Sequence, residues 1–294
     1  GGRDNIAKTK SEIYQGLSDT GTAIVPFGDD YFDTLLNNAQ QFTQNILTFG
    51  ERDVSLADAG VDMQQAKEIG LTDEDTVLLM GDVFADDVEV GNTSTFSLNF
   101  NFDIDEIESQ NVTLNFAGEH NISNALAAAA CAQALGLSID DIAKGLDAAK
   151  PAKGRLNFIE FGRHTLIDDT YNANPSAVIA ATQVLVSQGA PTLLVLGDIG
   201  ELGDAAQEEH RKLGEAIAAS GVTVLYTVGE LTPVTVAQAQ ASGMQAQAYP
   251  DKATLLAAIK DKLTSSDDAW HILFKGSRYM RMEQIIDELT RQPF

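Results

Sequence analysis

Two adjacent carboxylates and two amides follow an apolar segment in the run Leu166-Ile167-Asp168-Asp169-Thr170-Tyr171-Asn172-Ala173-Asn174-Pro175. Carboxylates at the carboxyl end of a strand can accept hydrogen bonds from ribose hydroxyls or hold Mg²⁺ through water. The alternative is a structural role, in which Asn174 caps a helix that has Pro175 at its first position. Because two acids and two amides exceed what a cap needs, we favour a functional role.

A second polar cluster, Gly118-Glu119-His120-Asn121-Ile122-Ser123-Asn124, precedes an alanine-rich segment that favours a helix. The unpaired amides and the dipole of a helix N-terminus attract anions, so polar side chains there can position an anion or a purine. In the alternative, Asn121 only caps the helix and His120 is an ordinary loop residue. The spacing alone favours this alternative.

Glycines at intervals of three follow the apolar segment 193–196, at Gly197, Gly200 and Gly203. This spacing is not the G-x-G-x-x-G pattern of dinucleotide-binding loops. A substrate-facing loop and a plain turn between strand and helix are supported about equally.

Basic residues mark the run Phe274-Lys275-Gly276-Ser277-Arg278, where another predicted strand meets a helix. Two cations and a hydroxyl at such a place can bind a carboxylate or a phosphate, and we favour this role slightly over that of solvated cations. Near the N-terminus, Lys8 and Lys10 lie two positions apart on a predicted helix and so point in different directions. By default both are surface lysines.

Hydrophobic periodicity predicts mixed elements in the first half of the chain. Strands are expected over 22–26 and 45–49, and antiparallel strands appended to the same sheet between about Asp75 and Phe116, including 76–80, 95–100 and 112–116. The expected helices are 4–17, 30–40, 121–135 and 139–149. The Pro and Gly of segment 150–154 indicate a linker, and we place the domains at 1–152 and 153–294.

Strands and helices alternate regularly after the linker, which predicts a doubly wound, Rossmann-like sheet whose ligands bind at the carboxyl ends of the strands. The expected strands are 157–161, 164–168, 192–196, 223–228, 245–249 and 271–274. The expected helices are 175–187, 204–219, 232–242, 251–263 and 277–291. The predicted fold class is therefore α/β throughout.

The composition narrows the classes of partner. The chain has 294 residues, 44% of them hydrophobic, and 19 Lys and Arg against 43 Asp and Glu, a formal net charge of -24. Such a negative field repels nucleic acids and anionic lipid surfaces, so we expect neither as a partner. The single cysteine, Cys131, is expected to be buried and reduced. With no predicted membrane span or signal peptide, we expect a cytoplasmic protein, as a monomer.

Taken in order, these runs resemble the Mur ligases along essentially the whole chain. The matching segments are 6–13, 120–127, Gly154-Arg155, 168–175, 196–203 with His210, and 275–278. One such match would be weak evidence for the family, but six matches in the same order are strong evidence. The resemblance implies the later part of the family's central ATPase domain followed by its Rossmann-like C-terminal domain.

The resemblance implies an ATP-dependent amide ligase and is strongest to the member that adds D-alanyl-D-alanine. In that reaction ATP phosphorylates the carboxylate of UDP-MurNAc-tripeptide, and the amine of D-alanyl-D-alanine attacks the acyl phosphate. Phosphoryl transfer of this kind depends on positioning and charge neutralisation, so Mg²⁺ is implied with ATP.

Roles for single residues are also implied by the resemblance. Lys10 resembles the lysine that the family carbamoylates to help hold Mg²⁺. His120, Asn121 and Asn124 resemble residues at the nucleotide, with Asn124 at the adenine. Arg155 resembles the linker arginine that reaches the phosphates, and Asp169 the acid that binds the ribose. The dipeptide and acyl-phosphate side is assigned to Asn172, Asn174, Lys275, Ser277 and Arg278.

One part of the family pattern is missing. The chain contains no Gly-Lys dipeptide, so the phosphate-binding loop of the central domain is absent, and the chain opens Gly1-Gly2-Arg3 without a methionine. We therefore expect a fragment of a longer protein that does not turn over alone.

Two alternatives remain. One is another amide ligase of the same superfamily, of the folylpolyglutamate or cyanophycin synthetase type, against which the run 171–174 argues. The other is a Rossmann-like module that binds a nucleotide or a dipeptide without chemistry.

Overall fold

The computed structural model describes residues 3–55, 76–103 and 106–291, together with residues 59, 67 and 72. Gly1, Gly2 and Asp75 lie outside the described residues. The chain divides into two compact units: unit 1 is Gly1–Asn115 with Glu119–Ala149, and unit 2 is Phe116–Gly118 with Lys150–Phe294. Among the described helices, none combines the length and the apolar character that a membrane span requires.

Unit 1 is built on a mixed five-stranded sheet with the strand order β1-β2-β5-β6-β7. Its strands are β1 (Thr22–Pro26), β2 (Asn45–Phe49), β5 (Val83–Glu89), β6 (Ser94–Asp103) and β7 (Glu106–Leu114). The strands β1, β2 and β5 are parallel, whereas β6 pairs antiparallel with both β5 and β7. This confirms a mixed sheet with added antiparallel strands.

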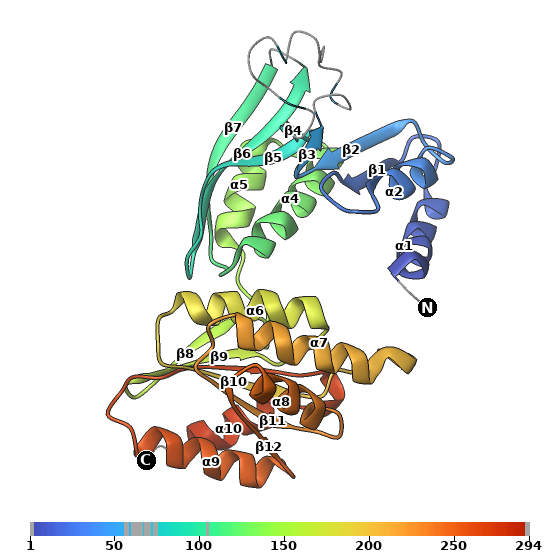
Figure 1. Cartoon of the computed structure of the whole chain (residues 1–294). Coiled ribbons are helices and arrows are strands. Elements are labelled where there is room, and N and C mark those ends of the chain that lie inside the picture. Colours follow the sequence, from blue (N-terminus) through green and yellow to red (C-terminus); the bar gives the residue numbers. More distant parts are fainter. Residues whose placement is uncertain are drawn as a thin grey trace. The chain divides into compact units, whose positions relative to one another are not determined.

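Helices cover the sheet of unit 1 (Figure 1). They are α2 (Phe32–Ala39), α4 (Glu119–Ala134) and α5 (Ile139–Ala148), and a further helix, α1 (Arg3–Ser11), packs on α2. The helix α4 packs on β1, β2 and β5, and its fully buried Ala129 and Ala130 permit a close approach. Ser138 caps α5 by accepting a hydrogen bond from the amide of Asp141.

Three expectations for unit 1 are wrong in detail. The helix expected over 4–17 ends at Ser11 and continues as a 3-10 turn, η1 (Glu12–Gly16), as helix ends often do. The strand β4 (Thr76–Met80) pairs with β3 (Glu51–Ser55) in a separate two-stranded sheet, because periodicity does not identify a strand's partner. Cys131 is exposed, since it lies beside the apolar stripe of α4 and not in it.

Unit 2 is an open six-stranded sheet with the order β12-β11-β10-β13-β9-β8. The strands are β8 (Asn157–Phe161), β9 (His164–Asp169), β10 (Thr192–Gly197), β11 (Val224–Val228), β12 (Gln245–Tyr249) and β13 (His271–Lys275). All neighbours from β12 to β9 are parallel, and the edge strand β8 pairs antiparallel with β9. The carboxyl ends of β9, β13, β10 and β11 therefore meet at one edge.

Helices lie on both faces of this sheet (Figure 1). They are α6 (Pro175–Ser187), α7 (Ala206–Ala219), α8 (Thr232–Ala241), α9 (Lys252–Thr264) and α10 (Glu283–Arg291). Alternate residues of β10 enter different cores: Leu194 and Leu196 pack with α6, α7 and α8, whereas Leu193 and Val195 pack with α9 and α10. This arrangement confirms the doubly wound fold.

The helix expected over 277–291 is wrong at its start. Residues 278–280 form a 3-10 turn, η3 (Arg278–Met280), and Arg281 then adopts a left-handed backbone with φ of +49°. A left-handed residue interrupts a right-handed helix, so α10 begins only at Glu283. The helix expected over 204–219 similarly starts with a 3-10 turn, η2 (Gly203–Ala205), before α7.

Candidate functional site

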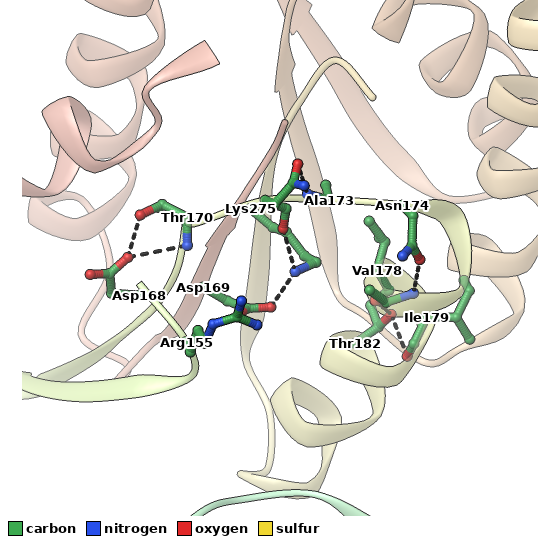
Figure 2. A network of polar contacts seen from close by, with 12 residues as sticks. Arg155, Asp168, Asp169, Thr170, Ala173, Asn174, Val178, Ile179, Thr182 and Lys275 are labelled. Carbon is green, nitrogen blue, oxygen red and sulfur yellow. Dashed lines mark hydrogen bonds and ion pairs between the residues drawn. The ribbon is translucent and has the colours of Figure 1, made fainter. Parts of the chain in front are cut away.

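A buried ion pair joins the ends of β9 and β13. The ammonium of Lys275 donates to Oδ2 of Asp169 over 2.5 Å and to the carbonyl oxygen of Asn172 over 3.0 Å (Figure 2). The two side chains are 4% and 13% exposed. Asp169 and Lys275 are register partners in the parallel pair, so the sheet itself sets their approach. Among the described residues, Oδ1 of Asp169 accepts no hydrogen bond, which leaves it able to accept one from a ligand.

The neighbouring acid, Asp168, has a different role. Consecutive side chains of a strand point to opposite faces, which separates Asp168 from Asp169. Asp168 is buried, and its Oδ1 accepts hydrogen bonds from the amide and the hydroxyl of Thr170, at 3.2 and 2.6 Å. It therefore fixes the turn after β9 (Figure 2).

Arg155 stands in the turn before β8 with an aromatic partner. Its guanidinium lies 4.4 Å from the ring centroid of Tyr171, in cation–π geometry. Both side chains are exposed, and Oδ1 of Asn157 orders the turn by accepting from the amides of Gly154 and Arg155. Tyr171 and Asn157 were not selected from the sequence as site residues. Tyr171 lies within the motif already quoted, whereas nothing in the sequence marks Asn157.

Asn174 is the N-cap of α6, as the structural alternative predicts. Its Oδ1 accepts from the amide of Ala177 over 2.7 Å, and Pro175 follows at the start of the helix. Asn172 is exposed, and its carbonyl oxygen is the one that binds Lys275. The two asparagines of the motif therefore differ: Oδ1 of Asn174 caps a helix, whereas Oδ1 of Asn172 accepts from the amide of its neighbour Ala173 over 2.9 Å.

Hydrogen bonds join the loop after β10 to the loop after β13. The amide of Gly200 donates to Oγ of Ser277 over 2.7 Å, and the amide of Ser277 donates to the carbonyl oxygen of Asp198 over 3.0 Å. Ser277 is buried, whereas Arg278 is exposed and pairs with Glu283 at 2.8 Å. Of the two, only Arg278 presents its side chain to solvent.

Asp198, in the loop with Gly197 and Gly200, is a buried carboxylate that no sequence pattern singles out. It accepts from the backbone amides of Glu230, Leu231 and Thr232, at 2.7, 3.0 and 3.0 Å, where α8 begins. Negative charge at a helix N-terminus is favourable. A Cβ on Gly229 would lie 2.2 Å from Oδ1 of Asp198, so only glycine fits there.

His210 is hydrogen-bonded to the loop that contains Asp198. It is fully buried, with Nε2 accepting from the amide of Ile199 at 3.4 Å and Nδ1 lying 2.9 Å from the hydroxyl of Thr235. Burial lowers the pKa of His210, and the nearby Asp198 carboxylate opposes this lowering. The imidazole is therefore neutral at pH 7, with its proton on Nδ1.

The polar cluster of unit 1 lies in the first turns of α4. Nδ2 of Asn124 donates to Oδ1 of Asn121 over 3.2 Å, and Nδ2 of Asn121 lies 3.3 Å from Nε2 of His120. The helix begins at Glu119, so the alternative in which Asn121 caps it is wrong. The three polar side chains predicted for the nucleotide therefore form one cluster.

A cavity of about 440 Å³ lies on another face of α4, at the carboxyl ends of β1 and β2. It is lined by Pro26, Gly28, Asp29, Phe49, Gly50, Glu51, Ala85, Val88, Glu119, Ile122, Ser123 and Leu126. Neither His120, Asn121 nor Asn124 lines it. The cavity is thus separate from the three polar side chains.

Lys10 lies in the last turn of α1, and both it and Lys8 are exposed. Within residues 3–55, 76–103 and 106–291, no three His, Cys, Asp or Glu side chains are grouped so as to hold a metal ion.

Two family models match the chain. The Mur ligase middle domain matches residues 1–132, and the glutamate ligase domain of Mur ligases matches residues 154–278. The UDP-N-acetylmuramoyl-tripeptide--D-alanyl-D-alanine ligase of Bacillus subtilis is 30% identical over 299 residues, which cover 100% of this chain and 56% of that protein. The chain thus spans about half the length of the curated relatives it matches along its whole extent.

Solved structures agree with these matches. MurF from Acinetobacter baumannii is 37% identical and superposes with a TM-score of 0.81, covering 99% of this chain and 56% of that one. MurF from Thermotoga maritima in complex with ADP is 22% identical, with a TM-score of 0.70 over 99% of this chain and 58% of that one, and shows a shared fold.

Proposed function

Because this chain belongs to the Mur ligase family, we propose that the whole protein containing it is an ATP-dependent ligase that joins D-alanyl-D-alanine to UDP-MurNAc-tripeptide. The reaction would take place in the cytoplasm, in the synthesis of peptidoglycan precursors. The observation that carries the proposal is the match to MurF of Acinetobacter baumannii over 99% of the chain, at 37% identity. The order of the polar clusters along the chain supports it.

ATP, when bound with Mg²⁺, supplies the phosphoryl group that activates the acceptor carboxylate. Asp169 is proposed to accept a hydrogen bond from the ribose, because Lys275 fixes the carboxylate through Oδ2 while Oδ1 accepts no bond among the described residues. Arg155 is proposed to reach the phosphates, since its exposed guanidinium is held, among the residues that the structure describes, by the stacking contact to Tyr171 alone.

His120, Asn121 and Asn124 are proposed to contact the nucleotide, with Asn124 at the adenine. Their amide and imidazole groups already order one another on α4, which favours a preorganised binding surface. Lys10 is proposed to hold Mg²⁺ after carbamoylation, since this modification replaces a cation with the oxygen ligands that Mg²⁺ prefers.

The dipeptide and acyl-phosphate side is proposed to involve Asn172, Asn174, Lys275, Ser277 and Arg278. Their surroundings divide them. Lys275, Ser277 and Oδ1 of Asn174 are engaged in internal bonds and shape the edge of the sheet. Oδ1 of Asn172 accepts from the amide of Ala173, and Arg278 pairs with Glu283. Both side chains are nevertheless exposed, so Nδ2 of Asn172 and the guanidinium of Arg278 are the groups proposed to touch the ligand.

The test uses the full-length protein with ATP, Mg²⁺ and UDP-MurNAc-tripeptide. Phosphate release is measured with and without D-alanyl-D-alanine, and mass spectrometry identifies the product. We expect release that depends on the dipeptide and a product heavier by one dipeptide less water. Release that depends instead on glutamate and a folate would identify a different ligase of the superfamily. Nucleotide binding without phosphate release would identify a binding module.

A further inference from the structure

Hydrogen bonds between side chains and loops connect the ends of four neighbouring strands in unit 2. Lys275 connects β13 to β9 through Asp169. Ser277 connects β13 to the loop after β10, and Asp198 connects β10 to the turn after β11. The edge where the family's ligands are expected is therefore one continuous network.

Ser277 occupies the centre of this network. Its hydroxyl accepts from the amide of Gly200 over 2.7 Å, and its own amide donates to the carbonyl oxygen of Asp198 over 3.0 Å. The residue is 5% exposed, so a ligand in solvent has little access to it. Its polar atoms thus connect protein to protein.

The two loops also meet backbone to backbone. A Cβ on Gly276 would lie 3.1 Å from Cα of Gly197 and 2.8 Å from Cγ of Met282. A Cβ on Gly200 would lie 2.9 Å from Cε1 of Tyr279. These glycines allow the loops to come close enough for the Ser277 bonds.

The loop that Ser277 holds contains an unfavourable backbone conformation. Glu201, directly after Gly200, has φ of +63°, in the left-handed region that residues other than glycine rarely adopt. Such a conformation persists only where its surroundings enforce it, and it is concentrated at functional sites. The bond from Gly200 to Ser277 is the restraint next to Glu201.

We propose that Ser277 is a positioning residue that acts through the amide of Gly200 to fix the loop 197–203 for the incoming amine substrate. This inference rests on the proposed ligase function. The hydroxyl of Ser277 does not touch the substrate; it sets the backbone that does.

The position of the loop in the sheet separates it from the carboxylate that is proposed for the ribose. Asp169, proposed for the ribose, ends β9, whereas the loop follows β10, and β13 lies between these two strands. Neighbouring strands are about 4.8 Å apart, so the loop starts roughly 10 Å from the strand that carries Asp169. A disturbance of the loop therefore changes binding of the amine substrate more than binding of ATP.

The experiment compares Ser277→Ala with the wild type in the full-length ligase. We expect the KM for D-alanyl-D-alanine to rise about two- to twelvefold, the range for one lost neutral hydrogen bond, while the KM for ATP does not change measurably. Ser277→Thr keeps a hydroxyl and is expected to restore most of the loss. In the free protein, hydrogen exchange at the amide of Gly200 should quicken in Ser277→Ala.

Ser220→Ala is the matched control. It removes a serine hydroxyl with a 2.7 Å bond to the carbonyl oxygen of Ile217, just before β11 and so at the opposite edge of the sheet. It should change neither KM. If Ser277→Ala unfolds, the KM for the dipeptide and the exchange at the amide of Gly200 are measured in Ser277→Cys, whose thiol fills the same place but accepts a hydrogen bond only weakly, and the same changes are expected.

The outcomes are distinct. No phosphate release by the wild type would contradict the proposed function and not this inference alone. An active wild type with an unchanged KM for the dipeptide in Ser277→Ala would overturn the inference. A loss confined to kcat, with slow exchange retained at Gly200, would also overturn it and make Ser277 a residue that contacts the reacting atoms.

Discussion

The ammonium of Lys275 lies 2.5 Å from Oδ2 of Asp169, although the two residues are 106 positions apart in the sequence. Parallel pairing of β9 and β13 places them at the same level of the sheet. The pair is largely buried, so each charge depends on the other for compensation. This pair therefore stabilises the ends of β9 and β13, and it orients the carboxylate that is proposed to bind the ribose.

Removing the cation should destabilise unit 2 strongly. Lys275→Met leaves the carboxylate of Asp169 buried without its partner, which costs about 3–5 kcal/mol. Urea unfolding followed through Trp270, the single tryptophan, reports on unit 2 because this side chain lies in its core. The control Lys212→Met breaks an exposed pair with Glu209 and should cost at most about 1 kcal/mol. Equal costs for the two variants would show that the Lys275 pair is not compensating a buried charge.

Asp198→Ala should cost more than the loss of an ordinary helix cap. It leaves three backbone amides at the start of α8 without their buried acceptor, for which we expect about 3 kcal/mol. The comparison is Asp251→Ala, which removes the N-cap of α9 from an exposed site and should cost clearly less. Both are measured by the same unfolding assay, and a smaller loss for Asp198→Ala would contradict its role in joining the loops.

Acid should weaken unit 2 through its buried histidines. Burial lowers the pKa of His210 from its ordinary value of 6.5, so the unfolded chain takes up a proton before the folded one does. The stability from the neutral imidazole is complete above pH 6.5 and declines as the pH falls through 6.5 towards the lowered pKa. Burial also lowers the pKa values of His164 and His271.

The variant His210→Gln isolates this effect. It should be less stable than the wild type at pH 8, and the difference should shrink between pH 6.5 and 5. Urea midpoints across this range measure the difference. A constant difference would mean that His210 does not take up a proton on unfolding.

Arg155→Ala should weaken ATP use with little effect on folding. The guanidinium is exposed, and its stacking on Tyr171 contributes at most about 1 kcal/mol to stability. Loss of a phosphate-binding cation should lower kcat/KM for ATP in the full-length ligase by about 10- to 100-fold. Arg163→Ala removes another exposed arginine, one that donates to the carbonyl oxygens of Leu263 and Ser266, and should leave kcat/KM unchanged. Equal activity of the two variants would remove Arg155 from the site.

Periodicity predicts most elements of unit 2 because central strands such as β10 and β11 are fully buried and mostly apolar, and because α6 and α9 begin at clear caps, Asn174 and Asp251. It fails where backbone geometry departs from the regular forms. Arg281 has a left-handed backbone that interrupts an otherwise helical pattern, and an arginine gives no sign of this conformation in the sequence. The pairing of β4 with β3 joins segments about 25 residues apart, and periodicity does not show which strand pairs with which.

The motifs of the candidate site are visible in the sequence, but the division of labour within them is not. Asp168 and Asp169 are chemically identical neighbours. Because their side chains point to opposite faces of the sheet, Asp168 fixes the turn and Asp169 pairs with Lys275. Likewise Ser277 and Arg278 are adjacent, yet one is buried between loops and the other is exposed. These distinctions arise from tertiary packing.

The most direct test of the ligase assignment is the rate of phosphate release that depends on D-alanyl-D-alanine in the full-length protein, compared between the wild type and Asp169→Asn. The substitution keeps the shape of the side chain and removes the charge that Lys275 orients. We predict a fall in kcat/KM for ATP of about 10- to 100-fold, the range for losing a charged hydrogen bond, with Asp267→Asn at an exposed loop unaffected. A wild-type rate in Asp169→Asn would contradict the placement of the nucleotide at this edge of unit 2.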